Sequence, residues 1–481
     1  MYKPTIGLEI HVELKTRTKM FCGCLNNSEE KRPNFNICPI CIGHPGTLPV
    51  INKKAIEEVL KLGMALNSQI PKESKFDRKN YFYPDLPKGY QISQYDKPFV
   101  IGGRLNGVNL RRIHLEEDAA RLIHSESGES SLVDFNRAGV PLMELVTEPE
   151  IKNGEEAVKF GKELRLILRY LGISDADMEK GQMRVEANIS VSKNSDLGTK
   201  VEIKNLNSFR VVGEAINYEI KRQEEALKSG EIVKHETRGW DENKKKTFHQ
   251  RAKEEAHDYR YFPEPDLPPL DLSDEDFIKL DELKNLIPEL PWQKRERFEK
   301  EFWLKREQME VLIEDRSLAE YFEESVSELL EEIKETIIEE KQKAVVLLFN
   351  YLTSDVSGFL SQKEMNIQSL NITTENFSDL ILLIFKNEIS SRVAKDLIAE
   401  MHKTGQDPRQ IIAEKGLSQV SDISEIEDMV KKIIIENLKP VEDYKKGQEN
   451  ALQFLIGRIM KASRGKVNPK IAKEMLEKLL R

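Results

Sequence analysis

The chain has 481 residues, of which 39% are hydrophobic and 33% charged, with a net charge of −9. This length predicts more than one domain, since a single core seldom grows beyond about 250–300 residues. No apolar run reaches the ~18–20 residues of a membrane-spanning helix, and the N-terminus "MYKPTIGLEI" resembles neither a signal nor a transit peptide. We therefore expect a cytoplasmic protein with no membrane association.

The first predicted element is a strand at residues 6–14, "IGLEIHVEL". Its apolar residues alternate with Glu9, His11 and Glu13, which is the period of a strand with one buried face. The three polar side chains therefore share a face, at a spacing of ~6–7 Å along the strand. For this strand alone, a solvated sheet face is a simpler explanation than a metal site.

The next segment contains every cysteine of the chain: Cys22, Cys24, Cys38 and Cys41. A Cys-x-Cys pair and a Cys-x-x-Cys pair joined by a loop can surround one tetrahedral Zn²⁺. Disulfides do not suit a reducing cytoplasm, and a redox Cys-x-x-Cys pair would leave the first two cysteines without a role. A four-cysteine site has no open position for a substrate. We therefore predict a structural zinc and expect the chemistry elsewhere.

Three later segments, "RIHLEEDAA", "GQMRVEANISVS" and "KVEIKNLNSF", repeat the alternation and place these side chains on polar faces: His114, Glu116 and Asp118; Arg184, Glu186, Asn188 and Ser190; Glu202 and Lys204. Neighbouring carboxylates are costly unless a cation neutralises them. Oxygen-rich sites with an imidazole suit Mg²⁺ or Mn²⁺, which often act in phosphoryl transfer. The sequence contains no Gly-x-x-x-x-Gly-Lys-Ser/Thr segment. The pattern therefore predicts a metal-dependent site on an antiparallel sheet.

The composition divides the chain into three predicted domains. Residues 1–292 have mixed strand and helix patterns and end in the proline-rich "YRYFPEPDLPPLDL", which favours an extended path. Residues 293–405 are rich in Glu, Lys, Leu and Ile at helical spacing, which predicts an all-α domain. Residues 406–481 predict a tail of short capped helices. The expected fold class is α+β.

The tail is basic although the whole chain is acidic. From Lys445 to Arg481 there are ten basic residues and three acidic ones. Five of the basic residues surround an apolar stripe: Arg458, Lys461, Arg464, Lys466 and Lys470. An ordinary basic helical surface and a contact with a nucleic-acid phosphate backbone explain this pattern equally well.

Long strings of the sequence resemble one family, the B subunits of the tRNA-dependent aspartyl/glutamyl amidotransferases. They run from the first strand to the last helix: "IGLEIHVEL", "RKNYFYPDLPKGYQISQYD", "HLEEDAA", "DFNRAGVPLMELVTEPE", "EIKNLNSFR", "AHDYRYFPEPDLPPL" and "FLIGRIMKASRGKVNPK". The resemblance implies a ligase that forms a carbon–nitrogen bond. ATP would phosphorylate the side-chain carboxylate of Glu-tRNA(Gln) or Asp-tRNA(Asn), and ammonia would then displace the phosphate.

The resemblance also implies partners and an architecture. A glutaminase, the A subunit of the complex, would supply ammonia through a channel. A small C subunit would brace the other two, so that the complex is a heterotrimer. The first domain would be a cradle with a sheet related to glutamine synthetase. A helical domain would follow it, and the tail would bind tRNA(Gln) or tRNA(Asn).

Residue by residue, the resemblance assigns catalysis and Mg²⁺ binding to Glu9, His11, Glu116, Glu117 and Glu186, and phosphate or acceptor contacts to Lys204 and Asn205. Strand alternation favours Glu116 over Glu117, but a β-bulge would present Glu117 instead. Glu186 stands where many members have Asp, so its geometry differs from theirs. Some members lack the four cysteines, which favours a structural role for the zinc.

Two other functions are compatible with these observations. One is a tRNA-binding scaffold with a structural zinc and no catalytic activity. The other is a free-standing metallohydrolase, which would be active without tRNA or partner proteins. Loss of ATP-dependent activity in a Glu9→Gln variant of the complex would separate the enzyme from the scaffold.

Overall fold

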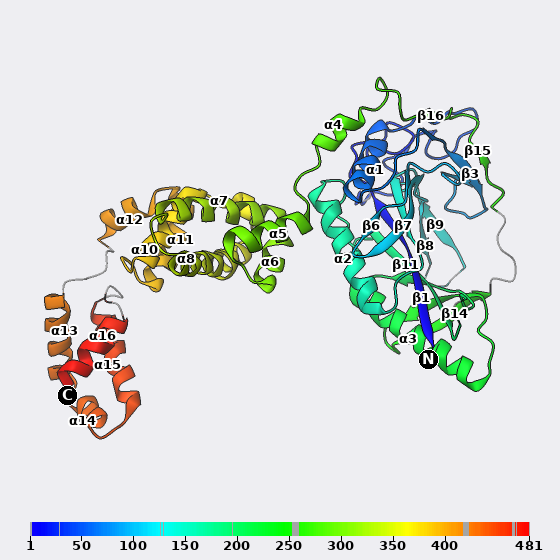
Figure 1. Cartoon of the computed structure of the whole chain (residues 1–481). Helices are drawn as coiled ribbons and strands as arrows, with labels where there is room; N and C mark the ends of the chain where they lie inside the picture. Colours follow the sequence, from blue (N-terminus) through cyan, green and yellow to red (C-terminus); the bar gives the residue numbers. More distant parts are fainter. Residues whose placement is uncertain are drawn as a thin grey trace. The chain divides into compact units, whose positions relative to one another are not determined.

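A computed structural model describes residues 2–480 apart from 28, 126, 128, 195, 253–258, 417–422, 464–466 and 468, with the backbone alone for 251, 252, 423–425, 449, 469 and 470. The chain divides into two compact units, Met1–Pro291 and Trp292–Arg481. The first unit contains a mixed sheet and the second is helical (Figure 1), which confirms the expected α+β class. A further division near residue 405 stays a prediction.

The first unit is built on one large sheet. Its strand order is β14-β13-β12-β11-β1-β10-β7-β5, with β6 also paired to β7. Every pairing is antiparallel except that of β12 with β13. The strands of this sheet are β1 (Lys3–Glu13), β5 (Val100–Ile101), β6 (Arg104–Leu105), β7 (Val108–Glu117), β10 (Pro141–Thr147), β11 (Met183–Ser192), β12 (Val201–Leu206), β13 (Glu236–Asp241) and β14 (Lys246–Ala252).

Smaller ladders and helices surround this sheet. The strands outside it are β2 (Glu73–Ser74), β3 (Asp77–Asn80), β4 (Tyr90–Ser93), β8 (Arg121–His124), β9 (Ser131–Asp134), β15 (Phe262–Pro263) and β16 (Leu270–Asp271). The helices are α1 (Lys53–Ala65), α2 (Gly154–Tyr170), α3 (Phe209–Ser229) and α4 (Leu280–Asn285). The first three begin at side-chain caps, since Asn52, Asn153 and Ser208 each accept a backbone N–H of the first turn.

The apolar residues of the predicted strands form the core of this unit. In β1, Ile6, Leu8, Ile10 and Val12 are at most 1% exposed. Helix α3 packs against β11, β12 and β14, and α1 packs against β7; Figure 1 shows α2 and α3 along the sheet. Because strand side chains alternate between faces, the polar residues of β1 point away from this core.

Strand β4 lies beside the end of β7 and binds it through side chains. Gln91 Nε2 donates to the Glu117 carbonyl at 2.8 Å, and Gln94 Oε1 accepts the Leu115 N–H at 3.1 Å. Both glutamines are buried. These bonds satisfy backbone groups of β7 beyond the reach of the short strand β5, and they fix the segment that carries Glu116 and Glu117.

The second unit contains the predicted helices. They are α5 (Pro291–Phe302), α6 (Arg306–Ile313), α7 (Arg316–Glu332), α8 (Ile338–Asn350), a π-helical turn (Tyr351–Val356), α9 (Ser357–Gln362), a 3₁₀ turn (Ile367–Ser369), α10 (Thr374–Phe385), α11 (Ser391–Thr404), α12 (Pro408–Lys415), α13 (Ile423–Glu436), α14 (Leu438–Lys445), α15 (Glu449–Ala462) and α16 (Pro469–Leu480). The last four helices enclose a core of their own that includes Ile426, Leu455 and Leu476.

One helical stretch of the described chain, Ile338–Gln362, is long and apolar enough to cross a membrane. A buried core helix has the same composition, and one such stretch is weak evidence for a membrane span. Val345, Leu348 and Leu352 of this stretch are fully buried within the helical unit. We therefore interpret it as a core helix.

Candidate active site

The face of the large sheet opposite its apolar core brings polar side chains of neighbouring strands into register. His11 of β1 lies opposite Glu144 of β10, and Glu144 lies opposite His114 of β7. On the other side of β1, Glu9 lies opposite Glu186 of β11. Directly opposed residues of antiparallel strands share a face, with Cβ atoms ~4.5–5.5 Å apart. The predicted strands β12, β11 and β1 are therefore consecutive in the sheet, β7 lies beyond β10, and their charged faces coincide.

Three of these side chains form a first cluster, made of His11, Glu116 and Glu144. Their ligand atoms all lie within 4.8 Å of one another. His11 Nε2 is 3.4 Å from Glu144 Oε2 and 3.6 Å from Glu116 Oε1. Ser93 Oγ donates to Glu116 at 3.1 Å, and His114 Nε2 lies 3.2 Å from Glu144. Both carboxylates are buried, so their positions are held from several sides.

Opposite charges control the protonation of the first cluster. Burial disfavours the His11 imidazolium, but Glu144 and Glu116 outweigh burial and raise the pKa of His11 to about 9. Burial likewise opposes ionisation of Glu144, but His114 and His11 outweigh it and hold the pKa of Glu144 well below its ordinary value. His11 therefore holds a proton, and with it a positive charge, between two buried carboxylates. A divalent cation can take the place of such a proton.

Three carboxylates form a second cluster, made of Glu9, Glu186 and Glu202. Their oxygens also lie within 4.8 Å of one another. Asn188 Nδ2 donates to Glu9 at 2.9 Å, and the buried Thr237 hydroxyl donates to Glu202 at 2.9 Å. Burial, followed by the charges of Glu144, Glu186 and Glu202, raises the pKa of Glu9. Such crowding of carboxylates is costly without a neutralising cation.

Lys204 supplies part of that positive charge. Its Nζ lies 2.7 Å from Glu186 Oε2 and 3.3 Å from Glu202 Oε1. Burial lowers the pKa of Lys204, but the two carboxylates outweigh burial and raise it overall. The neighbouring Asn205 is exposed, with a left-handed φ of +62°, where the pairing of β11 with β12 shifts register between Val185 and Ala187. Lys204 shares the face of Glu202 by regular alternation, and the irregularity after it leaves Asn205 outside the second cluster.

The donor sets of both clusters fit hard divalent cations. Carboxylate oxygens with one imidazole nitrogen suit Mg²⁺ or Mn²⁺. Ligand atoms ~2.1 Å from one Mg²⁺ lie up to about 4.2 Å apart. Small side-chain movements would therefore close either cluster around an ion. The charge of Glu144 in the first cluster also raises the pKa of Glu9 in the second, so the two clusters interact electrostatically.

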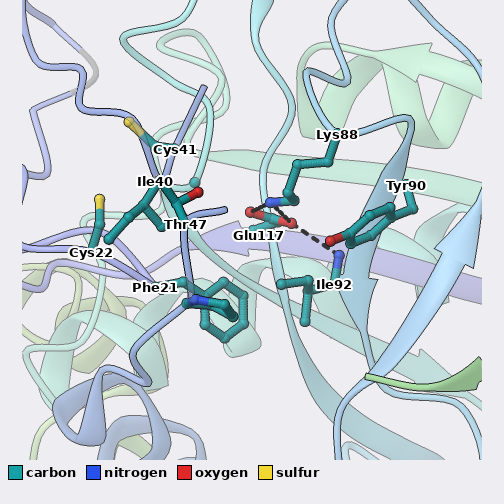
Figure 2. Close-up of a pocket in the computed structure, with 11 residues that line it drawn as sticks. Phe21, Cys22, Ile40, Cys41, Thr47, Lys88, Tyr90, Ile92 and Glu117 are labelled. Carbon is teal, nitrogen blue, oxygen red and sulfur yellow. Dashed lines mark hydrogen bonds and ion pairs between the residues drawn. The ribbon is translucent and has the colours of Figure 1, made fainter. Parts of the chain in front are cut away.

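Glu116 and Glu117 point to opposite faces of β7. The pairing of β7 with β10 is regular through Glu116 and Glu117, so the two side chains alternate and only Glu116 enters the first cluster. The Glu117 carboxylate instead lies 2.5 Å from Lys88 Nζ and accepts the Ile92 N–H at 3.0 Å. Figure 2 shows this pair in a pocket that the cysteine loop also lines.

Two members of the clusters were not among the residues predicted for the site. Glu144 is the only charged residue of the apolar string "PLMELV", which itself is a signal that sequence reasoning passed over. Glu202 was placed on the polar face of its strand but was given no role. Strand order brings both residues into the clusters, because β10 lies beside β1 and β12 lies beside β11. Sequence alternation does not show which strands are neighbours.

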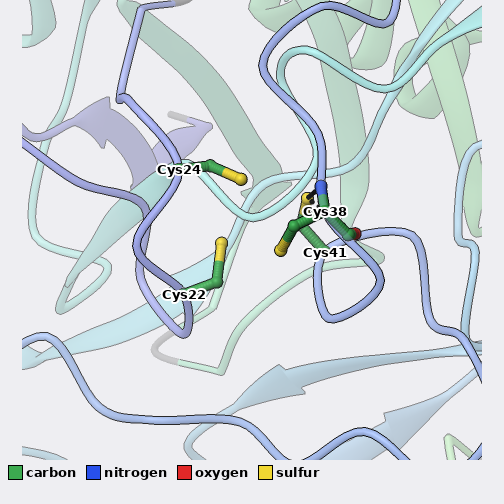
Figure 3. Close-up of side chains that lie close together, drawn as sticks. All are labelled: Cys22, Cys24, Cys38 and Cys41. Atoms are coloured by element: carbon green, nitrogen blue, oxygen red, sulfur yellow. Dashed lines mark hydrogen bonds between the residues drawn. The ribbon is translucent and has the colours of Figure 1, made fainter.

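The four cysteines converge in the loop between β1 and α1 (Figure 3). Their sulfurs lie within 4.8 Å of one another, and all four are free thiols. The Cys38 N–H donates to Cys41 Sγ at 3.1 Å, and the Ile42 N–H donates to the Cys38 carbonyl at 3.2 Å, as in a tight Cys-x-x-Cys turn. Four convergent sulfurs fit tetrahedral Zn²⁺.

The thiols of this loop perturb one another. A hydrogen bond from Cys22 lowers the pKa of Cys41 to about 5. Burial and then the hydrogen bond with Cys38 raise the pKa of Cys24 to about 11. Four sulfurs this close cannot all ionise without a cation, so the cluster is suited to a metal that takes up every thiolate.

The tail places part of the predicted basic set on one helix. Arg458 and Lys461 are exposed on α15. Arg464 and Lys466 lie outside the described residues, and the side chain of Lys470 does too. The opening residues of the string "AHDYRYFPEPDLPPL" also lie outside them.

Comparisons with known proteins agree with this architecture. Residues 4–278 match the family model described as the GatB/GatE catalytic domain, and residues 335–480 match the one described as the GatB domain. Over the full length of the chain, the aspartyl/glutamyl-tRNA(Asn/Gln) amidotransferase B subunit from Persephonella marina is 45% identical and is covered completely. The B subunit from Thermotoga maritima is 46% identical with 99% of its length covered, and one from Clostridium acetobutylicum is 45% identical with 99% covered. The chain therefore belongs to the family of amidotransferase B subunits.

Proposed function

We propose that this chain activates the side-chain carboxylate of Glu-tRNA(Gln), Asp-tRNA(Asn) or both for conversion to the amide. The observation that carries the proposal is the pair of three-ligand clusters on one face of the sheet, which interact electrostatically and differ in donor set. Adjacent cation sites are the usual device for holding a transferring phosphoryl group in a protein that has no P-loop. The relatives are named for action on tRNA(Asn) and tRNA(Gln).

In this proposal, the first cluster and the second cluster each hold one Mg²⁺. His11, Glu116 and Glu144 would bind one ion, and Glu9 with Glu186 and Glu202 the other. When bound, the ions would neutralise the triphosphate of ATP and polarise its terminal phosphorus. The side chain of Glu186 is one methylene longer than the Asp that the resemblance implies. Its carboxylate still lies within 4.8 Å of those of Glu9 and Glu202.

The remaining residues orient these ligands and the substrate. Thr237, Asn188 and Ser93 each donate to one oxygen of Glu202, Glu9 and Glu116, respectively, which orients these carboxylates within the clusters. Lys204 can exchange a carboxylate for a phosphate oxygen. Asn205 lies outside the second cluster but follows Lys204 directly and is exposed, which leaves it available for a contact with the acceptor end.

The chemistry conserves atoms and charge. A side-chain carboxylate oxygen of the aminoacyl-tRNA attacks the γ-phosphorus of ATP, and ADP leaves. Ammonia then attacks the carbonyl carbon, and phosphate leaves with the C–O electron pair. The product amide and the loss of one ammonia proton complete the reaction. Phosphorylation is needed because a carboxylate has no leaving group.

We also propose the partners and the setting. A glutaminase A subunit would supply the ammonia, and a small C subunit would complete a heterotrimer in the cytoplasm. The four-cysteine loop would hold a structural Zn²⁺. The basic residues of the tail, of which Arg458 and Lys461 are described as exposed, would contact tRNA phosphates.

The reconstituted complex tests the assignment with one pair of adjacent residues. We expect Glu116→Gln to lower the rate of ADP formation with Glu-tRNA(Gln) or Asp-tRNA(Asn) by about 10²-fold or more, because it removes a charged ligand. Glu117→Gln, the same substitution on the opposite face, should change that rate by less than about 10-fold. Thermal unfolding of both variants controls for folding.

Equal losses in both variants, or none in Glu116→Gln, would contradict the assignment. Unchanged turnover in Glu9→Gln would also contradict it and would favour a scaffold without catalytic activity. Amide formation on each misacylated tRNA, with purified complex, ATP and glutamine, decides which tRNA is the substrate.

A further inference from the structure

The ammonium group of Lys19 is buried beside the four cysteines. Lys19 is 0% exposed, its Nζ lies 3.8 Å from Cys41 Sγ, and the same nitrogen donates to the Phe135 carbonyl at 3.2 Å. Within the described part of the chain, no carboxylate forms an ion pair with it. The buried Lys294 of the helical unit is different, since its Nζ lies 2.9 Å from the Glu323 carboxylate.

A buried ammonium group is unfavourable unless an anion faces it. Without a metal, Lys19 faces the Phe135 carbonyl and the single Cys41 sulfur, whose low pKa of about 5 gives it one negative charge at neutral pH. Four thiolates around one Zn²⁺ carry a net charge of −2, because the ion cancels only half of the thiolate charge. The position of Lys19 is therefore more favourable in the metal-loaded loop, where it faces a net charge of −2, than in the metal-free loop, where it faces one thiolate.

We propose that Lys19 is the counter-charge of the four-thiolate zinc site, a positioning residue that makes the loop favour its zinc-loaded state. The inference deepens the structural zinc of the proposed function and rests on it. Lys19 would interact with the charge of the whole thiolate cluster. Its direct contact in that cluster is Cys41 Sγ.

The backbone around Lys19 holds the ammonium group in this place. The Lys19 N–H donates to the Cys24 carbonyl at 3.0 Å, and the Met20 N–H donates to the Gly139 carbonyl at 2.7 Å. Gly139 has a φ of +82°, and a Cβ there would lie 3.5 Å from Cys41 Cβ and 3.6 Å from Lys19 Cδ. A left-handed glycine therefore lets three segments meet at the cysteine loop.

The same contacts connect the loop to the active-site strands. Phe135, whose carbonyl accepts from Lys19, lies six residues before Pro141, the first residue of β10. The Gly139 N–H donates to the Asp118 carbonyl at 2.9 Å, directly after the end of β7. Lys19 thus joins a thiolate to the segment that leads into the strand of Glu144.

Three variants of the full chain separate charge from hydrogen bonding. Lys19→Gln removes the charge and keeps a donor for the Phe135 carbonyl, Lys19→Met removes both, and Lys19→Arg keeps the charge. Zinc affinity is measured by competition with a chromophoric chelator. Thermal unfolding is recorded with zinc and after zinc removal, and the Co²⁺ absorption spectrum reports tetrahedral thiolate coordination in each variant.

We expect Lys19→Gln and Lys19→Met to bind zinc about 10-fold or more weakly, the size of other outer-shell effects, and Lys19→Arg to stay within a few-fold of the parent. The two neutral variants should lower the Tm of the zinc-loaded protein more than the Tm of the metal-free protein. A purely structural lysine would shift both Tm values alike. Lys61→Met, at a lysine buried on α1, is the control and should shift both Tm values alike.

Parent-like zinc affinity in Lys19→Gln would overturn the inference and assign Lys19 to its hydrogen bond alone. The same Tm shift with and without zinc would overturn it too. A parent chain that binds no zinc would refute the zinc site together with the inference. Activity of the complex is a separate measurement, so none of these outcomes bears on the proposed phosphoryl transfer.

Discussion

At the scale of single residues, the alternation of side chains along a strand gives two adjacent glutamates of β7 different surroundings. Glu116 enters the first cluster, and Glu117 binds Lys88 on the other face. Glu144 contributes as much to the first cluster as the two predicted members, because it lies between His11 and His114. Electrostatics at this scale therefore follows from strand register.

Glu144→Gln is expected to weaken binding of Mn²⁺, used as a probe for Mg²⁺, by about 10–100-fold and to slow ADP formation at least as much. The change removes the negative charge that faces both imidazoles, while the amide keeps the size of the side chain. Electron paramagnetic resonance of Mn²⁺ measures the affinity. Glu148→Gln, at a half-buried residue paired with Arg111 after the same strand, should leave it unchanged.

Glu58 predicts a pH dependence of stability that is independent of the active site. Burial on α1, opposed by Lys54 and Lys61, raises the pKa of Glu58 to about 7, and its Oε2 has no hydrogen-bond partner within the described residues. A raised carboxyl pKa means that the folded state holds the proton more tightly. The contribution of Glu58 to the free energy of unfolding is therefore fully present below the unfolded pKa of about 4.5. It is lost as the pH rises to the folded pKa of about 7.

Glu58→Gln should consequently increase the free energy of unfolding at pH 8 by up to about 3 kcal/mol and change it little at pH 4. Urea unfolding of the chain at both pH values measures the effect. Equal changes at the two pH values would mean that packing of the amide, and not the proton, is responsible.

At the scale of elements, β4 and β7 depend on each other. The Leu115 N–H has Gln94 Oε1 as its partner, and Gln94 Nε2 donates to Ser74 Oγ and to the Lys75 and Lys97 carbonyls. One buried amide therefore satisfies backbone groups of two segments. Its geometry reaches the active site because Leu115 precedes Glu116.

Gln94→Met should lower the free energy of unfolding by about 2–3 kcal/mol, because it leaves buried backbone groups without partners. It should also reduce ADP formation through displacement of Glu116. Chemical denaturation and the kinetic assay measure the two effects. Gln410→Met on the exposed surface of α12 is the control. A stable Gln94→Met protein with unchanged kinetics would show that β7 does not need β4.

At the scale of the whole molecule, the chain combines a sheet with two candidate metal clusters and a helical unit with a separate core in its last four helices. The net charge of −9 opposes binding of a polyanion by the chain as a whole. A basic tail on an acidic protein would confine such binding to one region, as we propose for tRNA.

Removal of the residues after Gly416 is expected to weaken tRNA affinity and to flatten its dependence on salt. The truncated chain would contact fewer phosphates, so fewer counterions would be released on binding. The double variant Arg458→Gln/Lys461→Gln should reduce the slope of log affinity against log salt by about one to two. Filter binding at several salt concentrations measures both. An unchanged slope would place the tRNA contact elsewhere.

The sequence alone determined the strands, their polar faces, the clustering of the four cysteines and the change to helices near residue 292. These features are local: alternation, cysteine spacing and helical periodicity are written in neighbouring residues. Only the tertiary structure decided that β10 and β12 join the site with Glu144 and Glu202, that Glu117 leaves it, and that Lys19 faces the thiolates. These facts depend on strand order and on contacts between distant segments, which follow from the packing of the whole unit and not from any single stretch of chain.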